Sequence, residues 1–207
     1  MPFPLNLSVN EDTIRLFAVS KLGWIKRNQK KFDAQQRIPQ REYKQRESHY
    51  FQGRRYLLNI IETEAIPKVV LKSKKFLELH IKPLTPTVKR HEILTEWYRV
   101  QLKKQIPSII KKWEKNLKIK VDDWKVQQMK TKWGSCNIEK KRIWVNLELA
   151  KKPEHCLEFI IVHEMVHLLE RHHNDRFLYY MEKHLPNWKS LKHELNRLPV
   201  SHADWKY

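Results

Sequence analysis

The sequence of 207 residues has a formal net charge of +19, because Lys and Arg number 42 whereas Asp and Glu number only 23. Apolar residues make up 41% of the chain, which allows a real hydrophobic core, but no apolar run approaches the roughly 20 residues that span a bilayer. Two cysteines exclude a disulfide framework, so we expect a reduced, cytoplasmic protein with no membrane partner.

The first part of the chain predicts one helix followed by short strands. Apolar residues recur at three- and four-residue spacing over residues 13–31, which indicates an amphipathic helix. Residues 35–48 are polar and contain Pro39, and we expect a loop there. Within residues 50–84, the segments YLLNIIE, KVVLKS and FLELHIK are rich in β-branched residues and predict a strand-rich meander.

The remaining part predicts helices around two further strands. A long amphipathic helix begins at Pro86 and extends to about Leu117, and Pro107 is the point at which it would break. Two strands and three helical stretches are expected after it, at residues 124–130, 142–146, 153–171, 175–184 and 188–196. This order of elements indicates an α+β fold and not a doubly wound sheet.

The segment FIIVHEMVHLL contains the pattern HExxH on an expected helix. His163 and His167 lie about one turn apart on one helix face, so both imidazoles can reach one tetrahedral Zn²⁺ at roughly 2.0–2.1 Å. Glu164 lies between them around the helix, where its carboxylate can take a proton from water as a general base. The rest of this helix is apolar, so burying two histidines and a glutamate in it is costly unless they bind something. The alternative to a metal site is that they are core residues whose polar atoms are satisfied by hydrogen bonds within the protein.

A third metal ligand requires the chain to reverse. In a continuous helix His173 would lie about 15 Å along the axis from His163, which is outside coordination range. We therefore expect the helix to end after about Glu170, with His172 as a left-handed turn residue and His173 on the metal. Glu170 is the alternative third ligand, because it follows His167 by three residues.

A second informative segment contains Trp133, Gly134 and Ser135, which are candidate substrate-binding residues. A Trp-Gly pair after a strand indicates a bulge or a close approach of another backbone. In a protease, such a segment could be an edge strand that pairs with an extended peptide substrate. Cys136 as a fourth ligand would instead close the site and make the zinc structural, and a packing role for this cysteine is the other alternative.

These motifs resemble the YgjP-like, or SprT-like, zinc metallopeptidase family. The resemblance rests on KTKWGSCN, RIWVNLELAKKP, FIIVHEMVHLLERHHNDRF and LPNW, with FQGRRYLL and WYR further upstream. The family pattern has a third His ten residues after the first, then Asn or Ser, and then Phe after three more residues. Here it falls on His173, Asn174 and Phe177, whereas the Trp that usually follows this Phe is Leu178.

The resemblance implies one Zn²⁺ per chain, held by His163, His167 and His173, with Glu164 as the catalytic base. It also implies a compact zincin-like α+β domain at residues 86–207, in which the HExxH helix packs on a small sheet. The N-terminal helix and strand-rich region of residues 1–85 would form one continuous unit with this domain. The implied activity is hydrolysis of peptide bonds in a protein or peptide substrate.

Two other functions remain open at this point. A metal-dependent nuclease and a nucleic-acid-binding module with a structural zinc would both suit the basic composition, because a basic surface attracts polyanions by counterion release. Small ribonucleases with this His spacing typically lack a Glu directly after the first His. Glu164 therefore favours the peptidase over the nuclease.

Overall fold

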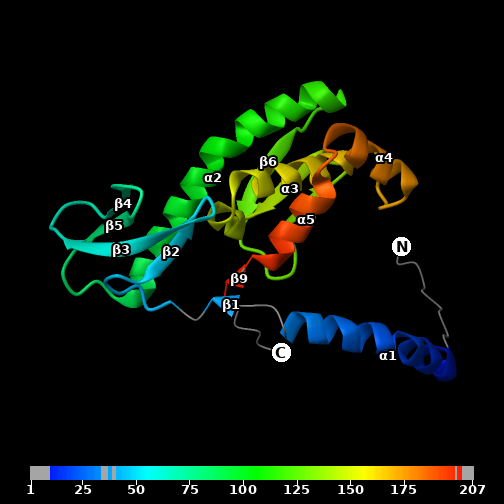
Figure 1. The fold of residues 1–207 in the computed structure, drawn as a ribbon, viewed down its shortest axis with the longest axis horizontal. Coiled ribbons are helices and arrows are strands. Elements are labelled where there is room, and N and C mark those ends of the chain that lie inside the picture. Colours follow the sequence, from blue (N-terminus) through cyan, green and yellow to red (C-terminus); the bar gives the residue numbers. More distant parts are fainter. Residues whose placement is uncertain (1–9, 34–36, 39–40, 199, 202–207) are drawn as a thin grey trace, which may run out of the picture. The chain divides into compact units, whose positions relative to one another are not determined.

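The structure is a computed structural model that describes residues 10–33, 37–38, 41–198 and 200–201 (Figure 1). The chain divides into two compact units, Met1–Arg37 and Ile38–Tyr207. The division between residues 85 and 86 that the sequence suggests stays a prediction. None of the described helices is long and apolar enough to cross a membrane.

The first unit contains the helix α1 (Glu11–Asp33), which confirms the helix expected over residues 13–31. Asn10 precedes it and accepts a hydrogen bond from the Asp12 N–H through Oδ1, at 3.1 Å. Acidic residues in the first turn suit the positive end of the helix dipole. The residues after α1 include the short strand β1 (Arg37–Ile38), and residues 35–36 and 39–40 of the expected loop lie outside the described residues.

The second unit begins with a four-stranded sheet of order β2-β3-β5-β4. Its strands are β2 (Ser48–Phe51), β3 (Arg54–Glu62), β4 (Lys68–Leu71) and β5 (Phe76–Ile81). Strand β3 pairs in parallel with β5, so the expected meander is wrong: β4 lies at the edge instead of between its neighbours in sequence. Residues 48–51 lie before the first expected strand segment, YLLNIIE, yet they form β2, which makes a hairpin with β3.

Helix α2 (Thr87–Leu117) begins directly after Pro86 and covers parts of both sheets. Its buried residues recur at helical spacing and form one face: Leu94, Tyr98, Leu102, Ile106, Ile110, Trp113 and Leu117. Pro107 lies inside the helix without ending it, so the expected break does not occur. Pro107 is an exposed residue of this helix.

A second sheet of order β6-β8-β7 follows α2 in the sequence. Its strands are β6 (Asp123–Gln127), β7 (Gly134–Asn137) and β8 (Arg142–Asn146). Strand β8 pairs in parallel with β6 and antiparallel with β7. The strand expected to reach residue 130 ends three residues earlier, and a 3-10 helix, η1 (Leu147–Lys151), continues from β8.

Three helices complete the second unit: α3 (Glu154–Val166), α4 (Asp175–His184) and α5 (Trp188–Arg197). A short strand, β9 (Val200–Ser201), follows them. Helix α3 is buried almost all round, because it contacts α2, α4, α5 and the strands β7 and β8 (Figure 1). The α+β class and the packing of the HExxH helix on a small sheet are thus confirmed.

Candidate metal centre

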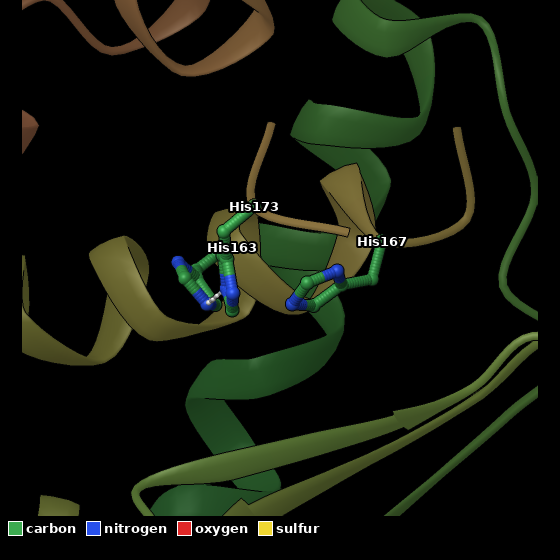
Figure 2. Close-up of side chains that lie close together, drawn as sticks. All are labelled: His163, His167 and His173. Carbon is green, nitrogen blue, oxygen red and sulfur yellow. Dashed lines mark hydrogen bonds between the residues drawn. The ribbon is translucent and has the colours of Figure 1, made fainter. Parts of the chain in front are cut away.

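Three histidines from α3 and the loop after it turn toward one another (Figure 2). His163 lies in the last turn of α3, His167 is the residue that caps its C-terminus, and His173 lies just before α4. The Nε2 atoms of His163 and His173 are 3.0 Å apart. One ligand atom from each of the three imidazoles lies within 4.8 Å of the others, so the three side chains could hold one metal ion.

The chain reverses at the end of α3 by a tight set of turns. Helix α3 ends at Val166, not near Arg171 as expected, and the N–H groups of Leu169 and Glu170 both donate to the Val166 carbonyl at 2.9 Å. His172 is not among the described residues with a positive φ, so the expected left-handed turn residue is wrong. The reversal takes place over residues 167–174 instead.

Asn174 fixes the start of α4 and with it the position of the preceding His173. Its side-chain oxygen accepts a hydrogen bond from the Phe177 N–H at 3.1 Å, which is a standard N-terminal cap. Phe177 is 2% exposed, and its ring centroid lies 5.0, 4.8 and 4.6 Å from those of His163, His167 and His173. The cap thus holds a phenyl ring against all three imidazoles.

All three imidazoles are biased toward the neutral form. Burial lowers the pKa of His163 to about 3, and the neighbouring His167, His173 and Lys192 add to this effect, in decreasing order. Burial also lowers the pKa of His167 and of His173, and for His173 the Lys192 ammonium adds to this effect. A neutral imidazole has a free lone pair on one nitrogen, which is the form that binds a metal ion.

The second nitrogen of His167 has a defined partner. Its Nδ1 lies 3.2 Å from the carbonyl oxygen of Glu170, to which a protonated Nδ1 donates. This hydrogen bond leaves Nε2 as the free nitrogen, as is usual for metal-binding histidines. The Glu170 carboxylate itself accepts the His172 N–H at 3.2 Å and does not belong to the histidine cluster. The alternative of Glu170 as third ligand therefore has less support than His173.

Glu164 is buried between α3 and the second sheet, with only 6% of its surface exposed. A Cβ atom built on Gly134 would lie 2.7 Å from its Oε1 and 2.8 Å from its Cγ, so the two residues are in close contact. Burial raises the pKa of Glu164 to about 7, although the Lys132 ammonium opposes this shift. A carboxyl group with this pKa is suited to exchange protons near neutral pH.

Of the candidate substrate-binding residues, Gly134 and Ser135 belong to β7 and Trp133 directly precedes it. Strand β7 pairs with β8 on one side and forms the edge of its sheet. No bulge accompanies Gly134, which pairs in register with Val145. The close neighbour is also not another backbone, as expected, but the side chains of Glu164 and Ile160 on α3, which leave no room for a Cβ atom.

Asn146 is a residue that the sequence analysis did not identify as important for this region. It is 4% exposed, and its side-chain nitrogen donates to the carbonyl oxygens of Met129 and Lys132 at 2.9 and 2.6 Å. Its backbone N–H donates to the Trp133 carbonyl at 2.9 Å. Asn146 thereby fixes the segment that leads into β7. The available signal in the sequence was an Asn at the end of the apolar strand segment RIWVN, where burial would require its amide to find partners.

Cys136 is close enough to Glu164 for the two to interact electrostatically. Burial first, and the Glu164 carboxylate second, raise the pKa of the Cys136 thiol to about 12. Its sulfur is not among the ligand atoms that cluster with the three histidines, within the part of the chain that the structure describes. The alternative of Cys136 as a fourth ligand in a closed, structural zinc site is therefore not favoured.

The chain was compared with known families and structures. Residues 4–198 match the family described as YgjP-like, metallopeptidase domain. No curated protein matches the sequence. Among solved structures, the zymogen of the metallopeptidase abylysin from Pyrococcus abyssi is 15% identical, with a TM-score of 0.42 over 47% of this chain and 99% of that one. The zymogen of jannalysin from Methanocaldococcus jannaschii is 20% identical, with a TM-score of 0.39 over 44% and 92%.

Proposed function

We propose that this chain, which belongs to the YgjP-like metallopeptidase family, is a zinc-dependent peptidase with Glu164 as its general base. Membership of the family makes the chain a peptidase that uses a divalent metal. The proposal adds the metal, its ligands and the base: one catalytic Zn²⁺ per chain, bound by His163, His167 and His173.

The observation that carries the proposal is the convergence of three neutral imidazoles beside a buried carboxyl group. Three imidazole nitrogens form a common ligand set of catalytic zinc sites, which keep a fourth position for water or substrate. Without a metal, two Nε2 atoms 3.0 Å apart can share only one hydrogen bond, and the third imidazole nitrogen nearby stays unused. The donor set therefore fits a zinc ion better than it fits a set of core histidines.

The zinc ion, when bound, supplies Lewis acidity, which lowers the pKa of a water molecule towards about 7 and polarises the scissile carbonyl. Glu164 takes the proton from this water as the oxygen attacks the carbonyl carbon. The protonated Glu164 then gives the proton to the nitrogen of the leaving amine as the C–N bond breaks. Because its pKa is raised to about 7 by burial, the same group can accept and return a proton at neutral pH.

The free edge of β7 is the best candidate for binding the substrate backbone. Strand β7 has a partner only on its β8 side among the described strands, so an extended peptide can add to its other edge by main-chain hydrogen bonds. The contact between Gly134 and Glu164 brings this strand next to the base. We propose that Trp133, Gly134 and Ser135 position the scissile peptide bond through this edge.

A second candidate is action on, or association with, nucleic acid, which the net charge of +19 favours. The exposed lysines give this candidate its only support. Glu164, directly after the first histidine, would act as the general base in peptide hydrolysis, whereas a nuclease with this His spacing does not need it. We therefore place peptide hydrolysis first.

Metal removal and a choice of two substrates test the proposal. The purified protein is incubated with casein, which is flexible and unfolded, and with a structured RNA, before and after treatment with a chelator. We expect one zinc ion at the histidine site, casein cleavage that the chelator abolishes and added Zn²⁺ restores, and no RNA cleavage. Chelator-sensitive cleavage of RNA with intact casein would favour the nuclease instead.

A further inference from the structure

A second group of metal-ligating side chains lies at the opposite end of α3 from the three histidines. It consists of His155 and Cys156, in the first turn of α3, and Glu194 on α5. Their ligand atoms lie within 4.8 Å of one another. Within the described parts of the chain, only this group and the three histidines bring at least three His, Cys, Asp or Glu ligand atoms this close together.

The distance between the His155 imidazole and the Glu194 carboxylate is close to that between two ligands of a small tetrahedral ion. The Nε2 atom of His155 and the Oε2 atom of Glu194 are 2.8 Å apart. Ligands at about 2.0 Å from a tetrahedral zinc ion lie about 3.3 Å from each other, so these two atoms need to separate by only about 0.5 Å. Nitrogen, sulfur and carboxylate oxygen are all ligands that zinc accepts, and a thiolate selects against Mg²⁺ and Ca²⁺.

Burial gives the site an inner and an outer side. Cys156 is fully buried, whereas the side chains of His155 and Glu194 are 47% and 42% exposed. An ion can therefore enter past the half-exposed imidazole and carboxylate and meet the sulfur behind them. A thiolate in such dry surroundings is stable mainly as a metal ligand, because burial disfavours its free charge.

The charges around the group partly oppose and partly favour a cation. The N-terminal end of α3 carries the positive end of the helix dipole and Lys152 lies buried nearby, and both disfavour a bound cation. Lys152 favours the thiolate form of Cys156, but burial and the Glu194 carboxylate outweigh it and raise the pKa of this thiol to about 12. A metal ion therefore has to displace the thiol proton when it binds. The Glu194 carboxylate supplies a second negative charge, so a divalent ion between the two ligands is neutralised.

We propose that His155, Cys156 and Glu194 form a second binding site for Zn²⁺ or a similar thiophilic divalent ion. The alternative is that His155 and Glu194 are simply a hydrogen-bonded pair beside a buried thiol. A bound ion would join the start of α3 to α5. Because α3 also carries His163, Glu164 and His167, this link would stiffen the helix that presents the catalytic groups.

Cobalt binding distinguishes the two possibilities, because Co²⁺ takes the geometry of zinc and absorbs strongly in the near ultraviolet only when a thiolate binds it. The test is a Co²⁺ titration of a variant with His163→Ala and His167→Ala, which removes two of the three imidazoles of the histidine site. We expect the thiolate absorption to appear, to vanish when Cys156→Ser is added, and to persist when Cys136→Ser is added. His155→Ala, which leaves the buried core intact, should weaken Co²⁺ binding at least tenfold.

Two further readouts keep the test independent of folding and of peptidase activity. Circular dichroism of each variant shows whether it is folded, and the zinc content of the otherwise unchanged protein should fall by one ion per chain on His155→Ala. Absence of the thiolate absorption in the folded variant, or absorption that disappears with Cys136→Ser, would overturn the proposal. Neither outcome bears on the three-histidine site, since the titrated variant lacks two of its ligands.

Discussion

At the scale of single residues, the sequence predicted the two histidines of HExxH more securely than the third. His163 and His167 are four residues apart on one helix, so their proximity follows from helical geometry alone. The position of His173 depends on where α3 ends and how residues 167–174 turn. Helix α3 ends at Val166, several residues before the expected end, and the N–H groups of Leu169 and Glu170 after it donate to the Val166 carbonyl. Local propensity does not encode such a reversal.

The first prediction separates the adjacent histidines 172 and 173. His173→Ala should lower zinc affinity by more than about 100-fold, because loss of a ligand costs more than loss of an outer-shell partner. His172→Ala should bind zinc as the unchanged protein does, since His172 is exposed and outside the cluster. Competition with a chelating dye measures both affinities. Equal losses in the two variants would show that the third ligand is assigned wrongly.

The second prediction concerns His49, a buried residue of β2 far from the metal site in sequence. Its Nε2 lies 3.4 Å from Oε2 of Glu47, and neither atom has a hydrogen-bond partner among the described residues. Burial, and then the Arg41 guanidinium, lower the pKa of His49 to about 4, although Glu47 opposes them. Lys151 also adds to the lowering. The folded protein therefore holds this imidazole in its neutral form.

Because the folded pKa of His49 is below the unfolded value of about 6.5, the unfolded chain gains a proton first as the pH falls. The contribution of His49 to stability is present above about pH 6.5 and is lost as the pH falls towards about 4. Relative to His49→Gln, the free energy of unfolding of the unchanged protein should fall by about 2 kcal/mol between pH 7 and pH 5. Urea unfolding measures this, and exposed His193→Gln is the control.

At the scale of elements, helices and strands were more predictable than their pairing. Helical periodicity predicted α1 and α2, but not that α2 continues through Pro107. Pro107 is exposed, so the carbonyl oxygen that loses its N–H partner to the proline can bind water instead. The parallel pairing of β3 with β5 was missed, since it joins strands that are not neighbours in the sequence. Likewise, the contact between α3 and β7 joins segments that are far apart in the sequence. The Trp133-Gly134 pair was the one local feature that indicated a close approach at this point.

The third prediction tests this contact between α3 and β7. Gly134→Ala would bring a methyl group to 2.7 Å from Oε1 of Glu164 and 2.9 Å from Cγ2 of Ile160, so the carboxylate must move. A displacement of about 1 Å at a catalytic group can cost about 100-fold in rate, and we expect kcat to fall by this order while zinc stays bound. Gly23→Ala is the matched control, because its nearest contact would be the Arg27 side chain at 3.5 Å. An unchanged kcat in Gly134→Ala would mean that Glu164 need not be held there.

At the scale of the whole molecule, the fold class followed from the order of elements, and the family followed from motifs spread along most of the chain. The net charge of +19 does not decide whether the protein binds nucleic acid, because exposed lysines suit both a solvated surface and a polyanionic partner. The chemistry depends on how the second unit assembles. It brings together a helix with two proposed ligands and the proposed base, a turn with the proposed third ligand, and an edge strand beside Glu164.

The central claim is that a metal at the three histidines acts together with Glu164, and the variant Glu164→Gln tests it most directly. The variant removes the base and keeps the shape of the side chain, so zinc content and folding should match those of the unchanged protein. Casein cleavage, followed by mass spectrometry, should fall by at least about 100-fold, as expected for loss of a general base. A folded, zinc-loaded Glu164→Gln protein that cleaves casein at the full rate would contradict the account.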